Sequence, residues 1–317
     1  MYKIERVKGP LSEREWGLYP GDADGLVAFR GSEVLARLAF GASSGFSGAP
    51  GLTGYVGWYH AADGEAGADL LRRAVQELFN RGARRVVGPL DGSTWHRYRF
   101  TLPGTGKPDS SGNAFLGEPV NPPEYPLHFE SAGFQPHLEY QSRIVRRPAT
   151  EPESGAVAAK LTQSGVEVRG LDVPRFTGMI REIHQLSLIA FAENPYFTSI
   201  DLTHFESLYA PLRPLVDPEL VRMAWSPDGR LLGFVFAYSD PLSSEPRVIL
   251  KTLASHPEVR GMGLGGLLTS QIDAAAALRG ASVIHALMQL FNFSGNISQR
   301  SESELFRRYR LYIADRH

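Results

Sequence analysis

The chain has 317 residues, with 33 basic and 34 acidic side chains and a formal charge of -1. This length favours two domains, and the apolar share of 43% predicts a packed core rather than disorder. The near-neutral charge excludes the basic surface of a dedicated nucleic-acid binder. The absence of cysteine excludes disulfides, thiolate metal sites and a cysteine nucleophile. With no apolar leader and no apolar run longer than Leu231–Tyr238, we expect a cytoplasmic protein without a membrane span.

In chain order, the first half predicts a strand, a helix and a second strand. Gly54–Tyr59 has the apolar run of a strand, and apolar residues four positions apart in Asp69–Phe79 indicate an amphipathic helix. Gly82 is a helix stop, and Val86 and Val87 begin another buried strand. This order of elements indicates an α/β fold.

Two irregular segments follow. Pro103–Pro126 is rich in Gly, Pro, Ser and Asn and predicts a long loop inside the first half. Arg146–Gly155 is polar, contains two prolines and follows the strand-like Leu138–Val145, so it predicts a linker. We therefore expect two domains, residues 1–148 and 149–317.

The second half repeats the pattern of the first. Strands are predicted at Val248–Leu253 and Val283–Met288, with an amphipathic helix between them that stops at Gly280. An offset of 198 residues, which places Gly82 on Gly280, also aligns apolar helix positions: Leu70, Ala74 and Leu78 with Leu268, Ile272 and Ala276. The repeat favours two domains of one fold.

A glycine-rich loop, Arg260–Gly266, separates the second-half strand from its helix. Unpaired N–H groups and the positive end of the helix dipole favour an anion there, and the guanidinium of Arg260 suits phosphate oxygens. The loop also satisfies G-x-G-x-x-G, but no acidic residue follows about 20 positions later to hold a ribose, so a dinucleotide site is excluded. A Gly-Lys-Ser/Thr sequence is absent, which excludes a P-loop. A turn that only starts the helix is the alternative to an anion site.

The order Arg260-Gly261-Met262-Gly263-Leu264-Gly265, between a strand and a helix, resembles the acyl-CoA pyrophosphate loop R-x-x-G-x-G of the GNAT N-acetyltransferase superfamily. The resemblance is specific over residues 248–292 and looser over Glu182–Tyr238, where Asn194–Phe197 is similar to a loop between that family's first two helices. The first half is similar at the level of architecture. The resemblance implies two tandem GNAT-like domains, each a mixed, mostly antiparallel sheet flanked by helices.

The resemblance further implies that acetyl-CoA is the co-substrate and that its acetyl group passes directly to a primary amine of a small molecule or peptide. Neither a nucleic acid nor a membrane is implied as a partner, no metal site is expected, and the oligomeric state is not indicated. The residues implied to bind the cofactor lie at the strand end, in the loop and after the next strand: Leu253, Ala254, Ser255, Arg260, Gly261, Met262, Gly263, Leu264, Gly265, Gly266 and Asn292.

His285, in the strand after the helix, is the candidate catalytic base, with a buried structural histidine as the alternative. Asn292 equally suits a cap of the following segment. Many family members place a tyrosine a few residues after this asparagine as a general acid, and none follows here before Tyr309. The identity of the acid is therefore open.

The two halves differ at the loop. Under the offset of 198, Arg260 corresponds to Ala62, and two loop glycines correspond to Asp63 and Glu65. Carboxylates at a helix start cap its N–H groups and would repel a pyrophosphate. We therefore expect one acyl-CoA site per chain, in the second half.

Two further questions stay open from the sequence. The polar aromatic segment Gly88–Phe100 either covers the seam between the domains or binds the acceptor. The missing tyrosine and the altered first domain also favour a rival to the enzyme, a non-catalytic acetyl-CoA-binding sensor or scaffold.

Overall fold

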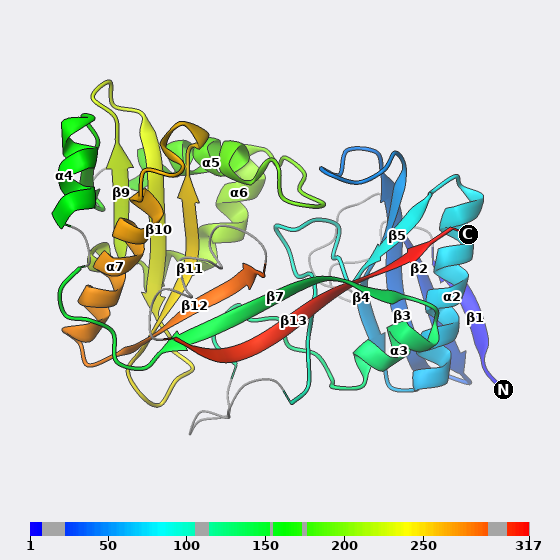
Figure 1. Cartoon of the computed structure of the whole chain (residues 1–317). Coiled ribbons are helices and arrows are strands. Elements are labelled where there is room, and N and C mark those ends of the chain that lie inside the picture. Colours follow the sequence, from blue (N-terminus) through cyan, green and yellow to red (C-terminus); the bar gives the residue numbers. More distant parts are fainter. Residues whose placement is uncertain (8–22, 105–113, 153–154, 173–175, 291–302, 317) are drawn as a thin grey trace.

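Helices flank one long sheet (Figure 1). The structure is a computed structural model, and it describes residues 1–7, 23–104, 114–152, 155–172, 176–290 and 303–316. The strands are β1 (Lys3–Val7), β2 (Asp24–Arg30), β3 (Glu33–Ser43), β4 (Thr53–Ala61), β5 (Arg85–Gly88), β6 (Phe100–Thr101), β7 (Gln135–Val145), β8 (Glu167–Gly170), β9 (Val221–Trp225), β10 (Leu231–Ser239), β11 (Arg247–Ser255), β12 (Ser282–Gln289) and β13 (Glu304–Asp315). The α-helices are α2 (Gly64–Asn80), α3 (Tyr125–Ser131), α4 (Gly155–Gln163), α5 (Phe176–Phe191), α6 (Leu202–Tyr209) and α7 (Leu264–Ala277).

The described strands form a single mixed sheet. Its order is β1-β2-β3-β4-β5-β13-β7-β12-β11-β10-β9-β8, with the short β6 paired to β13. The pairs β4 with β5 and β11 with β12 run parallel, and the other pairs are antiparallel. The expected α/β fold with a mixed, mostly antiparallel sheet is confirmed.

The two halves repeat the same order of elements. Shifted by 198 residues, α2 would cover 262–278, and α7 covers Leu264–Ala277. The same shift would place β5 at 283–286, inside β12, and β3 at 231–241, where β10 covers Leu231–Ser239. The internal repeat predicted from the sequence is therefore present in the structure.

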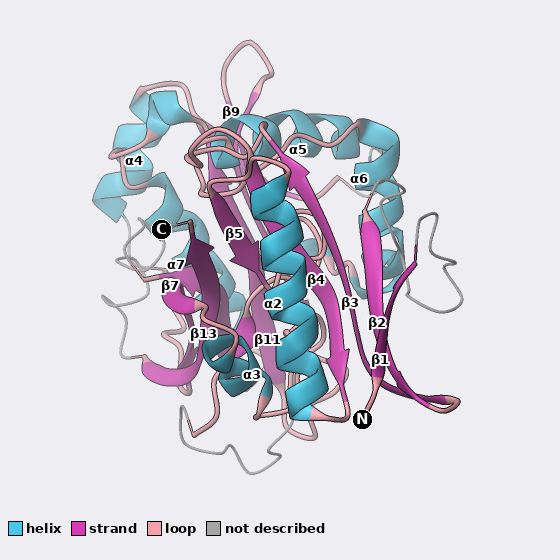
Figure 2. Cartoon of the chain, turned by 90° about the vertical axis from the view of Figure 1, so that its right-hand side faces the viewer, coloured by secondary structure: helices cyan, strands magenta, loops and turns pink. Residues whose placement is uncertain are grey.

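Each half buries the apolar face of its long helix against the sheet. Leu70 and Leu78 of α2 are fully buried in a core shared with β3 and α3, and Leu268 and Ile272 of α7 are fully buried in a core shared with β10 and β12. Burial of one leucine side chain contributes about 1.5–3 kcal/mol, so these faces fix the helices on the sheet. Figure 2 shows α2 lying across the first-half strands. Helix α5 packs on the face of the second-half sheet opposite to α7.

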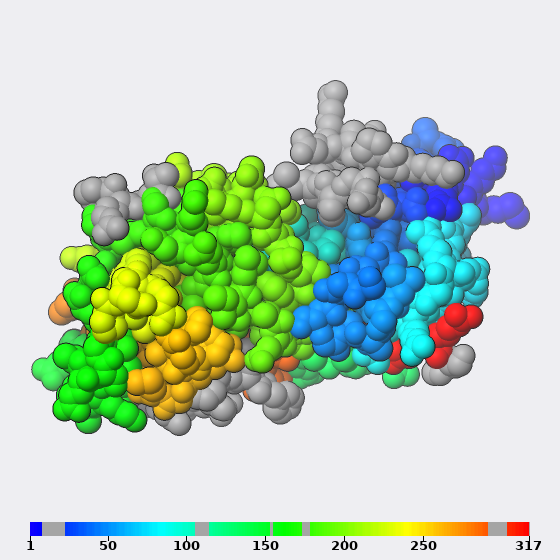
Figure 3. Space-filling model, turned by 90° about the horizontal axis from the view of Figure 1, so that it is seen from above, coloured from blue at the N-terminus to red at the C-terminus, as the bar shows by residue number. Residues whose placement is uncertain are grey.

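The last strand of the chain lies among the strands of the first half. Strand β13 pairs with β5 on one side and with β7 on the other, and β7 in turn pairs with β12 of the second half. In Figure 1, β7 and β13 run as two long strands between the two ends of the molecule, and in Figure 3 the red C-terminal residues lie beside the cyan first-half residues. The two halves thus share their last strands, and a domain boundary between residues 148 and 149 stays a prediction.

Side-chain and backbone contacts hold the end of β13 in the first half. The amide of Arg316 donates to the carbonyl of Arg84 at 3.0 Å, and Arg85 Nε lies 2.7 Å from Asp315 Oδ1. Among the described residues, no helix combines the length and the apolar character that a membrane crossing requires.

Because β13 fills the position between β5 and β7, we expect a fragment of residues 1–148 to fail to fold alone. An unpaired sheet edge exposes backbone N–H and C=O groups and promotes aggregation. Near-UV circular dichroism and urea unfolding of the fragment should therefore show no cooperative transition. In the matched control, the full chain is cleaved at a protease site introduced within residues 149–152, and it should keep its transition because all strands are present. A cooperative transition of the fragment alone would show that the first half is an independent domain.

Candidate functional site

Strands β11 and β12 separate partway along their length. Their parallel pairing ends at Leu250 and His285, although β11 continues to Ser255 and β12 to Gln289. On its other side, β11 stays paired with β10 as far as Ser255. The sheet therefore contains a V-shaped gap between two of its central strands, where backbone groups of β11 have no strand partner in the described part of the chain.

Each strand carries a bulge where the gap begins. Thr252 and Leu250 pair with consecutive residues of β10, so Lys251 is an extra residue in β11. In β12, Ala286 and Leu287 together face the single residue Ser142 of β7. Bulges turn side chains away from the regular alternation of a strand and are common beside active sites. Here they direct Lys251 and the carbonyl of Leu287 to the gap.

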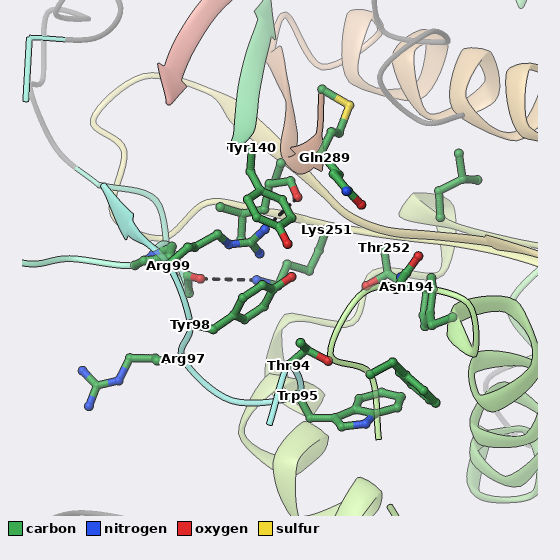
Figure 4. A pocket seen from close by; sticks show the side chains of 18 of the residues that line it. Thr94, Trp95, Arg97, Tyr98, Arg99, Tyr140, Asn194, Lys251, Thr252 and Gln289 are labelled. Atoms are coloured by element: carbon green, nitrogen blue, oxygen red, sulfur yellow. Dashed lines mark hydrogen bonds between the residues drawn. The ribbon is translucent and has the colours of Figure 1, made fainter. Parts of the chain in front are cut away.

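A cavity of about 290 Å³ occupies this gap. Its walls come from β11, from β12 and from two segments that approach from outside the sheet, Thr94–Arg99 of the first half and the loop around Asn194–Phe197 of the second (Figure 4). Trp95 Nε1 donates to the carbonyl of Thr198 at 2.7 Å, which joins these two segments. The polar aromatic segment found in the sequence thus covers the seam between the halves and also lines the cavity.

Arg99 is the buried cation of the cavity wall. Its side chain lies between two aromatic rings, with Cζ 4.0 Å from the centroid of Tyr98 and 4.3 Å from that of Tyr140. Its Nη1 donates to the carbonyl of Leu287 at 3.2 Å. Arg99 and Leu287 both have a positive φ, 68° and 58°, which non-glycine residues adopt at a cost of about 1–3 kcal/mol. The packing around this contact therefore holds a strained backbone in place.

Lys251 adds a second positive charge (Figure 4). Its Nζ donates to the carbonyl of Gly117 at 3.3 Å. Burial, followed by the charge of Arg99, lowers the pKa of Lys251 from 10.5 to about 8. This amine can therefore hold or release a proton close to neutral pH.

His285, the expected base, borders the cavity but is bonded on the side of α7. It is 3% exposed, and its Nε2 lies 3.2 Å from Oδ1 of Asp273 in α7. This contact fits the structural alternative raised from the sequence, since it ties β12 to the helix packed on it. A role of His285 in catalysis stays a prediction.

The glycine-rich loop leads from β11 into α7 with the expected open helix start. Gly261 and Gly263 have positive φ values of 79° and 89°, and no side chain of the described residues caps the N-terminus of α7. In contrast, Asp63 caps α2 in the first half by accepting a bond from the amide of Ala66 at 3.0 Å. The first half thus fills with its own carboxylate the place that the second half leaves open.

Other predicted cofactor residues lie around this loop. Leu253, Ala254 and Ser255 form the end of β11, beside the gap. Arg260 is turned to α5, where its guanidinium donates to Glu193 Oε2 at 3.1 Å and to a backbone carbonyl at 3.1 Å. Glu193 is 83% exposed, and an ion pair at such a surface is weak, so this contact can exchange for a ligand. Asn292 lies outside the described residues.

Comparison with known proteins matches part of the chain to a known family. Residues 182–293 match the model of the acetyltransferase (GNAT) family, whereas no curated protein matches the chain. Among solved structures, the chain is similar to a GCN5-related N-acetyltransferase from Sphaerobacter thermophilus, with 14% identity and a TM-score of 0.52 over 95% of this chain and 84% of that one. It is also similar to Eis1 from Mycobacterium abscessus, with 10% identity and a TM-score of 0.52 over 99% and 73% of the two chains.

A third similar structure is the GCN5-related glucosamine N-acetyltransferase region of a fungal multi-domain β-N-acetylglucosaminidase. The identity is 12% and the TM-score 0.54, over 99% of this chain and 38% of that one. The chain therefore contains a GNAT-family domain in its second half and has, over nearly its whole length, the fold of GCN5-related N-acetyltransferases. The resemblance drawn from the glycine-rich loop is confirmed.

Two residues of the cavity were missed in the sequence. Lys251 is the one charged residue within the apolar run Val248–Leu253, which is a signal that could have been used. Arg99 has no comparable signal, because its position depends on a contact with Leu287, 188 positions away in the chain.

The half-buried charge of Lys251 leads to a prediction about stability. Because the folded protein holds this proton less tightly (pKa about 8) than an unfolded chain does (10.5), the charge destabilises the fold fully below pH 8, and the cost disappears as the pH approaches 10.5. We expect Lys251→Met to raise the free energy of unfolding by about 1–2 kcal/mol at pH 7. Urea unfolding at pH 7 and pH 10 should show this gain shrinking at the higher pH.

The matched control is Lys251→Arg, which keeps the charge and should give no gain at either pH. A Lys251→Met variant that is less stable than the natural protein at pH 7 would show that the ammonium group is well solvated or paired in the fold.

Proposed function

We propose that the protein is an N-acetyltransferase that moves the acetyl group of acetyl-CoA to a primary amine. The observation that carries the proposal is the uncapped N-terminus of α7, in the segment that matches the GNAT family, directly after the strand that borders the V-shaped gap. GNAT domains in general support acyl transfer from acyl-CoA to an amine. We propose in addition that acetyl-CoA is the donor and that the amine attacks its thioester directly.

The geometry supports a path for the co-substrate. The N–H groups of the loop Arg260–Gly266 would hold the pyrophosphate, as an open helix start favours anions. The pantetheine arm would then run along Leu253–Ser255, where backbone groups of β11 face the gap. Lys251 lies four residues before Ser255 in the same strand, which is roughly 13 Å at the usual rise of a strand. The thioester would thus reach the cavity.

Lys251 is the ionisable group best suited to move protons in this reaction. The neutral amine attacks the thioester carbonyl, the new C–N bond forms, and the C–S bond breaks. The ammonium group of Lys251 gives its proton to the departing thiolate and then takes one from the newly bonded nitrogen, so the protons balance. A pKa of about 8 supports this role because it is close to the ordinary thiol value of about 8.5. Lys251 would thus serve as the acid that the sequence left open.

We expect acetyl-CoA to bind one site per chain, and a carboxylate placed in the loop to remove that binding. Gly266 suits this test because a Cβ there meets no atom within 4 Å, so Gly266→Glu brings a charge without a clash. An acidic residue in the first turn of a helix stabilises it by about 0.3–1 kcal/mol, so the fold should be kept while acetyl-CoA affinity falls about 10- to 100-fold.

Titration calorimetry gives both the stoichiometry and the affinity. Gly266→Gln is the matched control, since it has the same size without the charge and should bind far better than Gly266→Glu. Two equivalent sites in the natural protein, or equal binding by both variants, would contradict an anion site at this helix start.

Turnover is tested by release of free CoA in the presence of a broad panel of primary amines. We expect saturable release, and we expect Lys251→Met to lower kcat about 100-fold with little change in KM for acetyl-CoA, because proton transfer by a positioned group contributes about 10²–10⁴-fold. Tight acetyl-CoA binding without release for any amine would instead support a sensor or scaffold. An unchanged kcat in Lys251→Met would remove Lys251 from the mechanism.

A further inference from the structure

Arg99 is a buried charge without an acidic partner among the described residues. It is 7% exposed, it donates to one backbone carbonyl, and its Nε has no hydrogen-bond partner in the described part of the chain. Elsewhere the protein pairs a buried arginine fully: Arg247 donates to Asp240 Oδ2 from Nε at 2.9 Å and from Nη2 at 2.6 Å. Buried charges are normally paired because their desolvation is costly. The missing partner of Arg99 therefore points to a ligand.

The charged residues that line the cavity are, like Arg99, positively charged. Its lining residues in the described chain include Arg97, Arg99 and Lys251, but neither Asp nor Glu. Arg97 is 77% exposed, lies 3.6 Å from Asp91 and points away from the cavity in Figure 4. The positive charge inside the cavity thus comes from Arg99 and Lys251.

The nearby carboxylate of Glu118 does not neutralise this pair. It raises the pKa of Lys251, but it accepts bonds from the hydroxyl of Tyr309 and the amide of Phe115 and lies 3.2 Å from Arg307 Nε. Glu118 is held behind the wall and is not one of the residues that line the cavity.

The proposed co-substrate does not supply the missing negative charge either. Its pyrophosphate would lie at the loop Arg260–Gly266, which begins beyond Ser255 and so more than roughly 13 Å along the chain from Lys251. The part of acetyl-CoA that would reach the gap, the thioester, is uncharged. Since neither the described residues nor the thioester end of acetyl-CoA supplies an anion for Arg99, the acceptor is the source that we consider.

We propose that the acceptor is an amine that also carries an acidic group, and that Arg99 binds this group. The inference rests on the proposed function, which it deepens by naming the substrate class. Arg99 lies between Tyr98 and Tyr140, so the plane of its guanidinium is fixed in orientation for a charge-assisted contact with a carboxylate. The same cavity disfavours polycationic amines, since like charges in a partly buried site repel.

The remaining walls fit an apolar body for this acceptor. Trp95, Phe197 and Tyr209 line the side away from the strands, and Trp95 is fixed by its bond to the carbonyl of Thr198. A cavity of about 290 Å³ is at the small end of the range for ligand pockets. An amino acid with an apolar or aromatic side chain is therefore a suitable probe.

The experiment compares amines that differ only in the acidic group. CoA release is measured with phenylalanine, phenylalanine amide and phenethylamine, and with phosphoethanolamine and ethanolamine to separate a carboxylate from a phosphate. We expect kcat/KM to be about 10- to 100-fold higher for an acidic amine than for its neutral counterparts. Amidation makes the amine of phenylalanine less basic and so more available, hence amine reactivity cannot explain a preference for the acid.

Variants of Arg99 assign the preference to this residue. Arg99→Gln should raise KM for the preferred acidic amine about 10- to 100-fold more than it raises KM for the neutral amines, whereas Arg99→Lys should restore part of the difference. A merely structural role of Arg99 would lower activity equally for both kinds of amine. Acetyl-CoA affinity checks that each variant is folded. Equal kcat/KM for acidic and neutral amines would overturn the inference.

A binding measurement separates this inference from the proposed function. If no amine releases CoA, the proposed function fails, but calorimetry of CoA-loaded protein with N-acetylphenylalanine and its amide still tests Arg99. We expect the acid to bind at least about 10-fold more tightly than the amide, and Arg99→Gln to abolish the difference. Equal affinity for the acid and the amide would overturn the inference whether or not the protein is an enzyme.

Discussion

The antiparallel pairing of β7 with β13 is the contact on which the rest of the molecule depends. Each strand comes from a different half, and each also pairs with a strand of the other half, β12 or β5. This pairing makes one sheet out of two repeated units. It also places first-half side chains beside the gap between β11 and β12, so the cavity exists only because the halves are joined in this way.

The two halves show how one fold can serve two purposes. At the start of α2, Asp63 satisfies the helix and closes the position to an anion, whereas the start of α7 is left open. The first half instead contributes Trp95, Tyr98 and Arg99 to the wall of the second-half cavity. A repeat that does not need to hold a cofactor can vary its loops, and loops on a rigid sheet are where specificity commonly resides. In the function that we propose, cofactor binding and acceptor recognition are thus divided between the copies.

Much of this arrangement could be predicted from the sequence, because it is encoded locally. Apolar periodicity located α2 and α7, and four glycines after Arg260 located the open helix start. The exchange of β7 and β13 could not be predicted, since alternation shows which face of a strand is buried but not which strand lies beside it. The positions of the two cavity charges, Lys251 and Arg99, could not be predicted for a related reason. Lys251 faces the gap because of a one-residue shift in register, and Arg99 is positioned by a bond to a distant carbonyl.

The position of β13 also has a consequence for how the chain is made. Strands β5 and β7 leave the ribosome early, but their common neighbour is complete only at Asp315, about 170 residues after the end of β7. At a synthesis rate of about 5–20 residues per second, the first-half sheet waits roughly 10–30 s with two open edges. Vectorial synthesis thus cannot finish the first unit before the second. Where the two halves meet, the pairing of β5 and β7 with their common neighbour therefore has to wait until β13, the last strand of the chain, has been made.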